Sequence, residues 1–156
     1  MININNTIIL VIKMRMYYIF NIKESIYKLY KDNPSSLYKI LENIYFMHVE
    51  EIDYGFSIFK QITNRIKIMD TSNQIYIKLH KDLTYSKLDD SHVINDLYHD
   101  EVSVLKIKNS RIVLESNKSY SSFFKVLYDI NQHYFICDFK EKDFFFINEV
   151  IDKVKI

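Results

Sequence analysis

The sequence has 156 residues, with 21 Lys and Arg against 20 Asp and Glu, and it holds one Gly, one Pro, one Cys and no Trp. A chain of this length with 48% apolar residues predicts one folded domain rather than a disordered segment. The net charge of +1 lacks the basic excess that is typical of nucleic-acid binders.

The single Gly and the single Cys exclude several kinds of site. Phosphate-binding loops need several glycines, so Gly55 alone cannot supply the common nucleotide-binding motifs or the nucleophile elbow of hydrolases. Cys137 has no second cysteine for an intramolecular disulfide or a paired-cysteine zinc site, and we expect a reduced, cytoplasmic compartment. The early apolar run over residues 8–12 is far shorter than the ~20 residues of a membrane-spanning helix, so no membrane contact is expected.

The first residues differ from the rest of the chain. Residues 1–15 begin with a polar, β-leaning stretch that has no partner pattern, and Met14 and Met16 offer later start sites. We interpret 1–15 as an N-terminal extension that need not belong to the native start, and 16–156 as a single α+β domain. An ordinary frayed terminus is the alternative.

The first half of the domain predicts one strand and three helices. Aromatic and β-branched residues predict a buried strand over 16–22. Helical spacing predicts helices over 23–32 and 50–65, and Asn33 with Pro34 predicts the start of another helix that runs to residue 45. The side chains expected to face the core are Ile22, Ile26 and Leu29 in the first helix, Leu37, Ile40, Leu41, Ile44 and Tyr45 in the second, and Ile52, Phe56, Phe59, Ile62 and Ile66 in the third.

The second half predicts mainly strands. Residues 71–73 predict a turn, and alternation over 75–80 favours a strand, although a helix fits almost as well. Residues 82–100 are irregular, with a short helix predicted around Val93, Ile94, Leu97 and Tyr98. Two hairpins are predicted, over 101–116 and 134–148, separated by a helix over 119–130 and followed by a charged tail over 149–156. This pattern predicts an α+β fold with a mostly antiparallel sheet of about five strands and three to four helices packed against it.

One constellation suggests metal chemistry. His92, Asp96, His99 and Asp100 would share a face if 91–100 were helical, because residues three, four and seven apart align on a helix. Imidazole and carboxylate ligands suit Zn, Fe or Mn, so a small metal-dependent enzyme is the alternative function. A solvated polar face is the simpler interpretation. Cys137 has no base beside it in the sequence and is interpreted as a buried structural thiol.

The first predicted helix carries an aromatic border. Lysines and tyrosines alternate over 23–31, a pattern on which single-strand binders stack bases, but acidic residues interrupt it. Ile26 and Tyr30 lie about 40° apart on an ideal helix, which places Tyr30 at the edge of the apolar stripe with Tyr27 and Lys23 beyond it. Such a tyrosine either anchors a protein interface or covers the core with its hydroxyl in water, and the pattern alone leaves both open.

A longer arrangement of aromatic and aliphatic residues spans the chain. Its parts are Tyr17-Tyr18, Ile22-Lys23-Glu24, Phe123-Phe124-x-Val126-Leu127, Tyr134-Phe135-Ile136-Cys137-Asp138-Phe139 and Phe145-Phe146-Ile147-Asn148. This arrangement resembles the sporulation inhibitor of replication family (SirA) of low-GC endospore-forming bacteria, most firmly over 16–32 and 101–148. Members of that family often carry Trp near the final strand, where this chain has Phe145 or Phe146.

The resemblance implies a non-enzymatic cytoplasmic inhibitor without a cofactor. Such an inhibitor binds the N-terminal domain of the replication initiator DnaA, as a monomer in a one-to-one complex, and blocks new rounds of initiation during sporulation. The resemblance places the contact on the first helix, with Tyr30 as the binding aromatic, Tyr27 and Lys23 beside it, and Ile26 where a larger aromatic is familiar. A third contact falls near Lys60 and Gln61. No direct contact with nucleic acid or membrane is implied.

Overall fold

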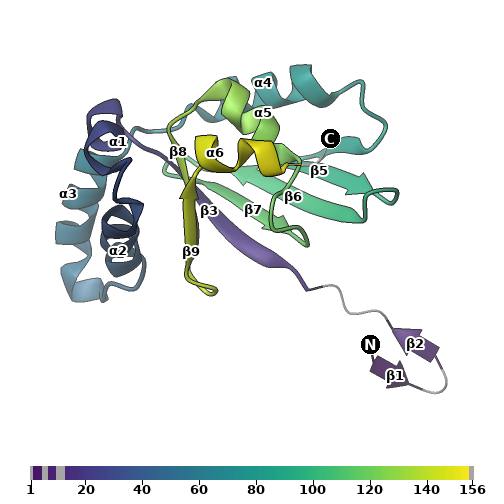
Figure 1. The fold of residues 1–156 in the computed structure, drawn as a ribbon, viewed down its shortest axis with the longest axis horizontal. Helices are drawn as coiled ribbons and strands as arrows, with labels where there is room; N and C mark the ends of the chain where they lie inside the picture. Colours follow the sequence, from purple (N-terminus) through teal and green to yellow (C-terminus); the bar gives the residue numbers. More distant parts are fainter. Residues whose placement is uncertain (1, 5–6, 10–12, 155–156) are drawn as a thin grey trace.

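The computed structural model describes residues 2–4, 7–9 and 13–154. Its main element is a seven-stranded sheet with the strand order β4-β5-β6-β7-β3-β8-β9, in which every neighbouring pair is antiparallel (Figure 1). The strands of this sheet are β3 (Arg15–Asn21), β4 (Tyr85–Leu88), β5 (Ser91–Asp96), β6 (Glu101–Ile107), β7 (Ile112–Ser116), β8 (Tyr134–Asp138) and β9 (Asp143–Phe146).

Helices cover the sheet in two groups. The helices are α1 (Glu24–Tyr30), α2 (Pro34–Tyr45), α3 (Ile52–Ile62), α4 (Ile68–Leu79), α5 (Phe123–Ile130) and α6 (Ile147–Val150), with 3-10 turns at Val49–Glu51 and Ile151–Lys153. Helices α4, α5 and α6 lie over one face of the sheet, and α1, α2 and α3 gather beside the end that β3, β8 and β9 form (Figure 1).

The interior strand β3 contributes to a core on each face of the sheet. Tyr17 and Ile19 belong to the cluster beneath α4 and α5, whereas Phe20 and Ile22 belong to a second cluster with α2 and α3. Side chains alternate between the two faces along a strand, so a strand that is covered on both faces is apolar almost throughout. This explains why residues 16–22 predicted a buried strand.

The predicted α+β class and antiparallel sheet are confirmed, but the predicted number of elements is wrong. Among the described residues the main sheet has seven strands rather than about five, and there are six α-helices rather than three to four. The extra strands lie in residues 82–100. This segment was predicted to be irregular, but it forms the hairpin of β4 and β5 at one edge of the sheet. The two predicted hairpins, β6 with β7 and β8 with β9, are present.

The predicted turn over 71–73 and the favoured strand over 75–80 are wrong, because α4 covers residues 68–79; the alternative of a helix over 75–80 is the one that formed. Thr71 and Ser72 are buried in this helix, and the Ser72 hydroxyl is hydrogen-bonded to His92 across the core. Tertiary packing has therefore overridden the turn preference of the segment.

The short helix predicted around residues 93–98 is also wrong. Val93 and Ile94 pair with β6 in strand β5, and Leu97 and Tyr98 project from the turn that follows. The predicted charged tail over 149–156 begins instead as α6 and a 3-10 turn, within which Val150 and then Val154 are buried. Helices predicted over 23–32, 50–65 and 119–130 are shorter at their ends than expected.

Several side chains predicted to face the core are exposed. Leu29, Ile52 and Phe56 all project into solvent, and Tyr45 is about half exposed. In α3, Ile62 is buried as predicted, and Gly55 is buried as well because the face of the helix that carries it packs inward. Ile66, which follows the helix, is also buried as predicted. Pro34 opens α2 with Asn33 at the N-cap, as predicted.

A separate two-stranded sheet, β1 (Ile2–Ile4) with β2 (Thr7–Ile9), lies within the predicted N-terminal extension. That extension and the apolar run over 8–12 lie partly outside the described residues. The start of the native chain at Met14 or Met16 stays a prediction. Within the described part of the chain, no helix has the length and apolar character to cross a membrane.

Candidate partner-binding surface

Helix α1 begins beside the end of helix α3. Ile22 forms an isolated antiparallel bridge with Thr63, and the Lys23 amide donates a hydrogen bond to the Ile62 carbonyl at 3.0 Å. These backbone contacts bring Lys23 close to the last turn of α3, which carries Lys60 and Gln61, both exposed. Two segments that are far apart in sequence, and that both carry predicted contacts, thus lie side by side.

Helix α1 has no buried residue, and its apolar side chains border the second core. Ile26, Tyr27 and Tyr30 are half-buried against the cluster that α2, α3, β8 and β9 share. Leu29 lies on the outer side of the helix and is 68% exposed. Because α1 is a single layer at the rim of the core, its apolar residues are partly available to another molecule.

Tyr27 is held more firmly than its neighbours. Its ring stacks on His133 with centroids 4.4 Å apart and meets the Phe146 ring edge-on at 5.0 Å. Its hydroxyl accepts a hydrogen bond from Asn148 Nδ2 at 2.7 Å. These three contacts attach α1 to β9, to α6 and to the residue before β8, so Tyr27 holds the helix in position.

The charges around α1 are mixed. Lys28 pairs with Glu24 one turn away at 3.4 Å, and Lys60 lies 4.4 Å from the centre of the Phe56 ring. Exposed pairs of this kind contribute little to stability, typically about 0–1 kcal/mol. The surface therefore offers apolar contact with a polar rim rather than a strong electrostatic field.

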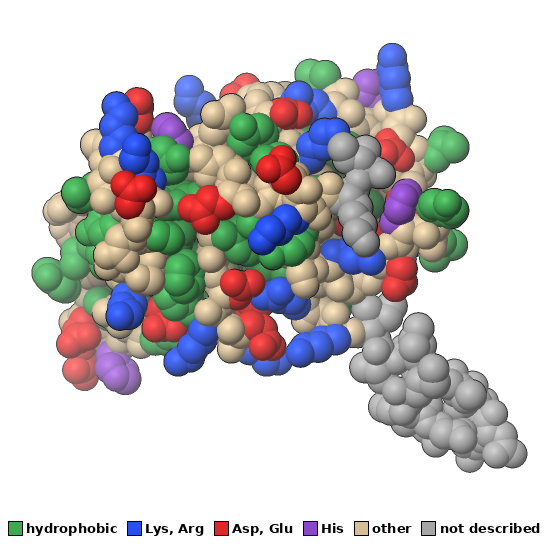
Figure 2. Space-filling view, viewed as in Figure 1, with side chains coloured by type: hydrophobic (Ala, Val, Ile, Leu, Met, Phe, Trp, Pro, Cys, Tyr) green, Lys and Arg blue, Asp and Glu red, His purple; other side chains and the backbone are tan. Residues whose placement is uncertain are grey.

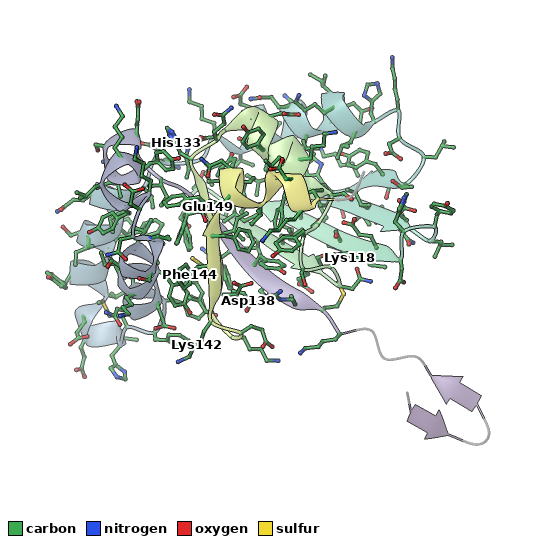
Figure 3. All side chains as sticks on the ribbon, viewed as in Figure 1. Lys118, His133, Asp138, Lys142, Phe144 and Glu149 are labelled. Carbon is green, nitrogen blue, oxygen red and sulfur yellow. The ribbon has the colours of Figure 1, made fainter. Side chains whose placement is uncertain are left out.

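The apolar area extends beyond α1 to residues that the sequence did not single out. Hydrophobic side chains gather over α1, α2 and β9 on the face shown in Figure 2. Among them Phe144, labelled in Figure 3, is half-buried and stacks on Tyr38 with centroids 4.6 Å apart. The period-two alternation of Phe144 and Phe146 along β9 was the available signal, because it places both on the face toward the second core.

The residues of the alternative metal site do not converge. Both ring nitrogens of His92 are hydrogen-bonded, Nε2 to the Ser72 hydroxyl at 2.9 Å and Nδ1 to the Tyr85 hydroxyl at 2.7 Å. Burial, with a smaller effect from Lys87, lowers the pKa of His92 to about 4. His99 and Asp96 pair with each other at the surface at 2.7 Å. Among the described residues no three His, Cys, Asp or Glu side chains are grouped to hold a metal ion.

Cys137 lies in β8 within the second core and is fully buried. Burial raises the pKa of its thiol well above the ordinary value, which disfavours the reactive thiolate. The interpretation of Cys137 as a structural thiol is therefore supported.

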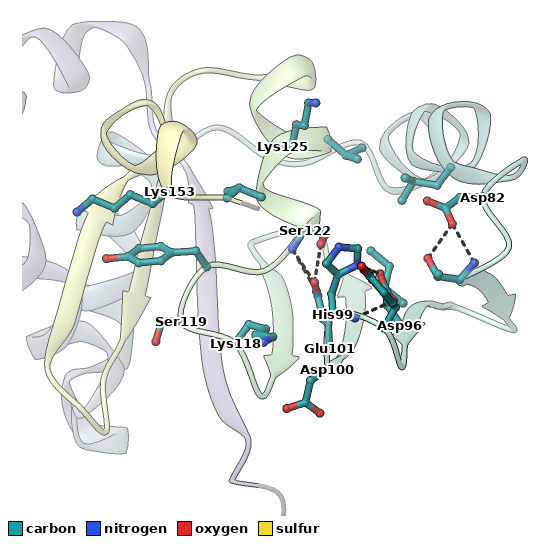
Figure 4. A pocket seen from close by; sticks show the side chains of 17 residues that line it. Asp82, Asp96, His99, Asp100, Glu101, Lys118, Ser119, Ser122, Lys125 and Lys153 are labelled. Atoms are coloured by element: carbon teal, nitrogen blue, oxygen red, sulfur yellow. Dashed lines mark hydrogen bonds and ion pairs between the residues drawn. The ribbon is translucent and has the colours of Figure 1, made fainter. Parts of the chain in front are cut away.

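A pocket of about 900 Å³ opens between β5, β6 and the start of α5 (Figure 4). Its floor holds Glu101, a buried carboxylate that accepts hydrogen bonds from the hydroxyls of Ser103, Ser121 and Ser122 and from the Ser122 amide. Because these donors use the hydrogen-bonding capacity of the carboxylate, Glu101 has a structural role in fixing the start of α5. Lysines and aspartates both line the rim, so the pocket has no single charge preference.

The fold and this surface define a small α+β protein that presents apolar side chains on a rim of short helices, a kind of surface that contacts other proteins. The chain matches the family model described as "Sporulation inhibitor of replication protein SirA" over residues 15–151, and it therefore belongs to the SirA family. The match runs from β3 to the end of α6 and includes α1 and α3. No curated protein matches the chain. The family is defined by inhibition of replication rather than by catalysis.

Proposed function

We propose that this protein inhibits the initiation of chromosome replication by binding the N-terminal domain of DnaA through the surface of α1 and the end of α3. Membership of the SirA family carries the proposal. The position of α1 supports it, because none of its residues is buried and its apolar side chains lie at the rim of a rigid core.

The mechanism is steric. The initiator uses its N-terminal domain for contacts between copies and for helicase loading, and a folded protein that covers this domain prevents productive assembly. An interface of standard size, about 1,600 Å² in total, is enough for a specific one-to-one complex. The net charge of +1 gives little long-range attraction, so the affinity depends on apolar contact.

The predicted contact residues divide into three roles. Tyr30 and Ile26 supply apolar contact at the rim of α1, and exposed Leu29 extends this area outward. Lys23, Lys60 and Gln61 form the polar rim where α1 and α3 meet. Tyr27 holds the helix in place through His133, Phe146 and Asn148.

A binding titration of the full chain with the isolated N-terminal domain of DnaA from the same organism tests the proposal. Because a central aromatic residue carries about 2 kcal/mol or more of binding energy, Tyr30→Ala should weaken the complex by at least roughly 30-fold. Its thermal unfolding midpoint should stay close to that of the original chain.

The matched control is Tyr76→Ala, which removes a partly exposed tyrosine from α4 in the other helical group. This variant should bind as the original chain does. Absence of binding by the original chain would reject DnaA as the partner. A large fall in the unfolding midpoint of Tyr30→Ala would assign Tyr30 to the core instead of the interface.

A further inference from the structure

The turn that joins α2 to α3 exposes a second apolar area, which we call the α2–α3 tip. It consists of the apolar residues Tyr45, Phe46, Val49 and Ile52 and the acidic residues Glu50, Glu51 and Asp53. The four apolar side chains are 49%, 61%, 83% and 57% exposed, respectively. So many large apolar side chains exposed within eight consecutive residues distinguish the tip from the scattered apolar residues of an ordinary surface.

The tip lies at the opposite end of the helical pair from the α1 surface. Helix α2 has 12 residues and therefore spans about 18 Å, and α3 runs back toward the start of α1, where Lys23 contacts Ile62. Figure 1 shows α1 at one end of this pair and the turn between α2 and α3 at the other. A molecule at the tip would therefore occupy a different surface from the one proposed to bind DnaA.

The aromatic part of the tip is held in place before any partner arrives. The Tyr45 ring stacks on the buried Phe139 ring with centroids 4.5 Å apart, and Phe46 meets Tyr45 edge-on at 4.9 Å. Behind the turn, Met47 packs so closely over Gly55 that a Cβ at this position would lie 2.5 Å from the Met47 sulfur. An apolar surface that is already ordered loses little conformational entropy on binding.

The charge of the tip is uniformly negative. Residues 40–59 hold four carboxylates and no Lys or Arg, and Lys39 and Lys60 lie just outside this segment. Glu50, Glu51 and Asp53 are exposed and form no ion pair with the described part of the chain. Acidic side chains and a histidine gather at this end of the helices in Figure 2.

We propose that the α2–α3 tip is a docking site for a segment of a partner protein whose apolar side chains are flanked by Lys or Arg. Aromatic and aliphatic residues supply contact area, and the surrounding carboxylates select basic flanks. The same carboxylates repel nucleic acid and anionic lipid, which leaves a basic protein segment as the complementary partner. This docking site goes beyond the proposed inhibition of DnaA and does not depend on it.

Two synthetic peptides of about 18 residues serve as probes, each with leucines on one helical face and either lysines or glutamates on the other. They are titrated into the full chain labelled with ¹⁵N, and amide signals report the site. The lysine peptide should bind in a one-to-one ratio and shift signals of residues 45–54. Added salt should weaken it several-fold, because screening of exposed charges increases with ionic strength.

The variants identify the surface. Phe46→Ser and Val49→Ser should each weaken the lysine peptide by about tenfold, and the double change Glu50→Gln with Glu51→Gln should weaken it less. Leu83→Ser, at a fully exposed leucine after α4, is the matched control and should bind as the original chain does. Tyr30→Ala should also leave peptide binding unchanged, which separates this site from the α1 surface.

Three results would overturn the docking site. Equal binding of the lysine and glutamate peptides would remove the charge preference. Signal changes outside the tip, or no effect of both Phe46→Ser and Val49→Ser, would place the peptide elsewhere. A dimer in light scattering that Phe46→Ser dissociates would assign the tip to contact between two copies of this chain.

Discussion

Helix α5 buries most of its apolar residues, whereas α1 and α3 expose many of theirs, although all three helices pack against the same domain. Helix α5 buries Phe123, Phe124, Val126 and Leu127 among its eight residues. Helix α1 buries none of its seven residues, and α3 buries only Gly55 and Ile62 among eleven. Apolar composition therefore indicates a core position for α5 and a surface position for much of α1 and α3.

The difference follows from the number of neighbours that each helix has. The α5 helix lies over the sheet between α4 and α6, whereas α1 and α3 lie at the end of the sheet with one side free (Figure 1). A helix with neighbours on several sides buries apolar residues on each of those sides. A helix with one side in solvent exposes any apolar residue that it carries on that side. Both surfaces that we propose to bind partners lie in the group of α1, α2 and α3.

The largest expected effect is a loss of stability at α5 that an exposed residue of α1 should not show. Phe124 is fully buried and meets the rings of Tyr17 and Phe145 edge-on. Phe124→Ala should lower the free energy of unfolding by about 3–5 kcal/mol, because it leaves a cavity in the core. Leu29→Ala on α1 should change it by less than about 0.5 kcal/mol. Urea unfolding of both variants makes the comparison, and equal losses would contradict the exposed position of Leu29.

The buried His92, which contacts Ser72 of α4, predicts that the stability of the fold depends on pH. Its pKa is lowered to about 4 by burial, whereas an unfolded chain binds the proton near the ordinary value of 6.5. The unfolded state therefore takes up the proton first as the pH falls, so the contribution of His92 to stability is lost between about pH 6.5 and 4, by up to about 3 kcal/mol.

Unfolding curves from pH 7 to pH 4 for the original chain and His92→Gln check this dependence. The variant keeps a polar group between Ser72 and Tyr85 but does not titrate in that range. The curves of the two proteins should converge as the pH falls. A constant difference between them would mean that His92 is protonated as easily in the folded state as in the unfolded chain.

A smaller loss of stability should show how much Tyr27 contributes to holding α1 in place. Tyr27→Phe and Asn148→Ala each remove the 2.7 Å hydrogen bond between them, and each should cost about 0.5–1 kcal/mol of stability. The double change should cost little more than either single change, because both remove the same bond. Asn43→Ala, at an exposed position of α2, is the control. Fully additive losses would show that the bond does not form.

At Gly55 two opposing effects should leave a small net change in stability. Gly55→Ala gains about 1 kcal/mol of helix propensity, but its Cβ would lie 2.5 Å from the Met47 sulfur and must displace that flexible side chain. The two effects oppose each other, so the net change should be below about 1 kcal/mol. The methyl signal of Met47 should move in NMR spectra, whereas Ser57→Ala on the exposed side of α3 should leave it in place. An unmoved Met47 signal would contradict the close packing.

Elements with a strong local pattern could be predicted from the sequence. Strand β3 formed where aromatic and β-branched residues follow one another, and the hairpins of β6 with β7 and β8 with β9 formed where polar turn residues separate two apolar segments. The local sequence did not predict helix α4, because Thr71 and Ser72 by themselves favour turns. In the folded protein these two residues are buried in the helix, and Ser72 is hydrogen-bonded to His92. The direction of an amphipathic helix was less certain than its existence.

The candidate surface shows the same limit. Helical spacing placed Leu29, Ile52 and Phe56 inward, since it counts apolar residues and does not know which neighbours a helix will have. The resemblance to the SirA family selected α1 and the end of α3, and the backbone bond from Lys23 to Ile62 shows that these segments are adjacent. Whether Tyr30, Ile26, Lys60 and Gln61 contact a partner stays a prediction.

The order of strands in the sheet determines how much of the chain must be synthesised before β3 and α1 can pack in their final positions. Strand β3 comes first in the main sheet along the chain, yet its two neighbours are β7 and β8, with Arg15 opposite Ser116 and Asn21 opposite Tyr134. The ribosome must therefore complete most of the chain before β3 has either neighbour, and Phe146 and Asn148, which hold α1 through Tyr27, come later still. The α1 surface, which we propose to bind a partner, therefore reaches its final position only after β9 and α6 have been synthesised.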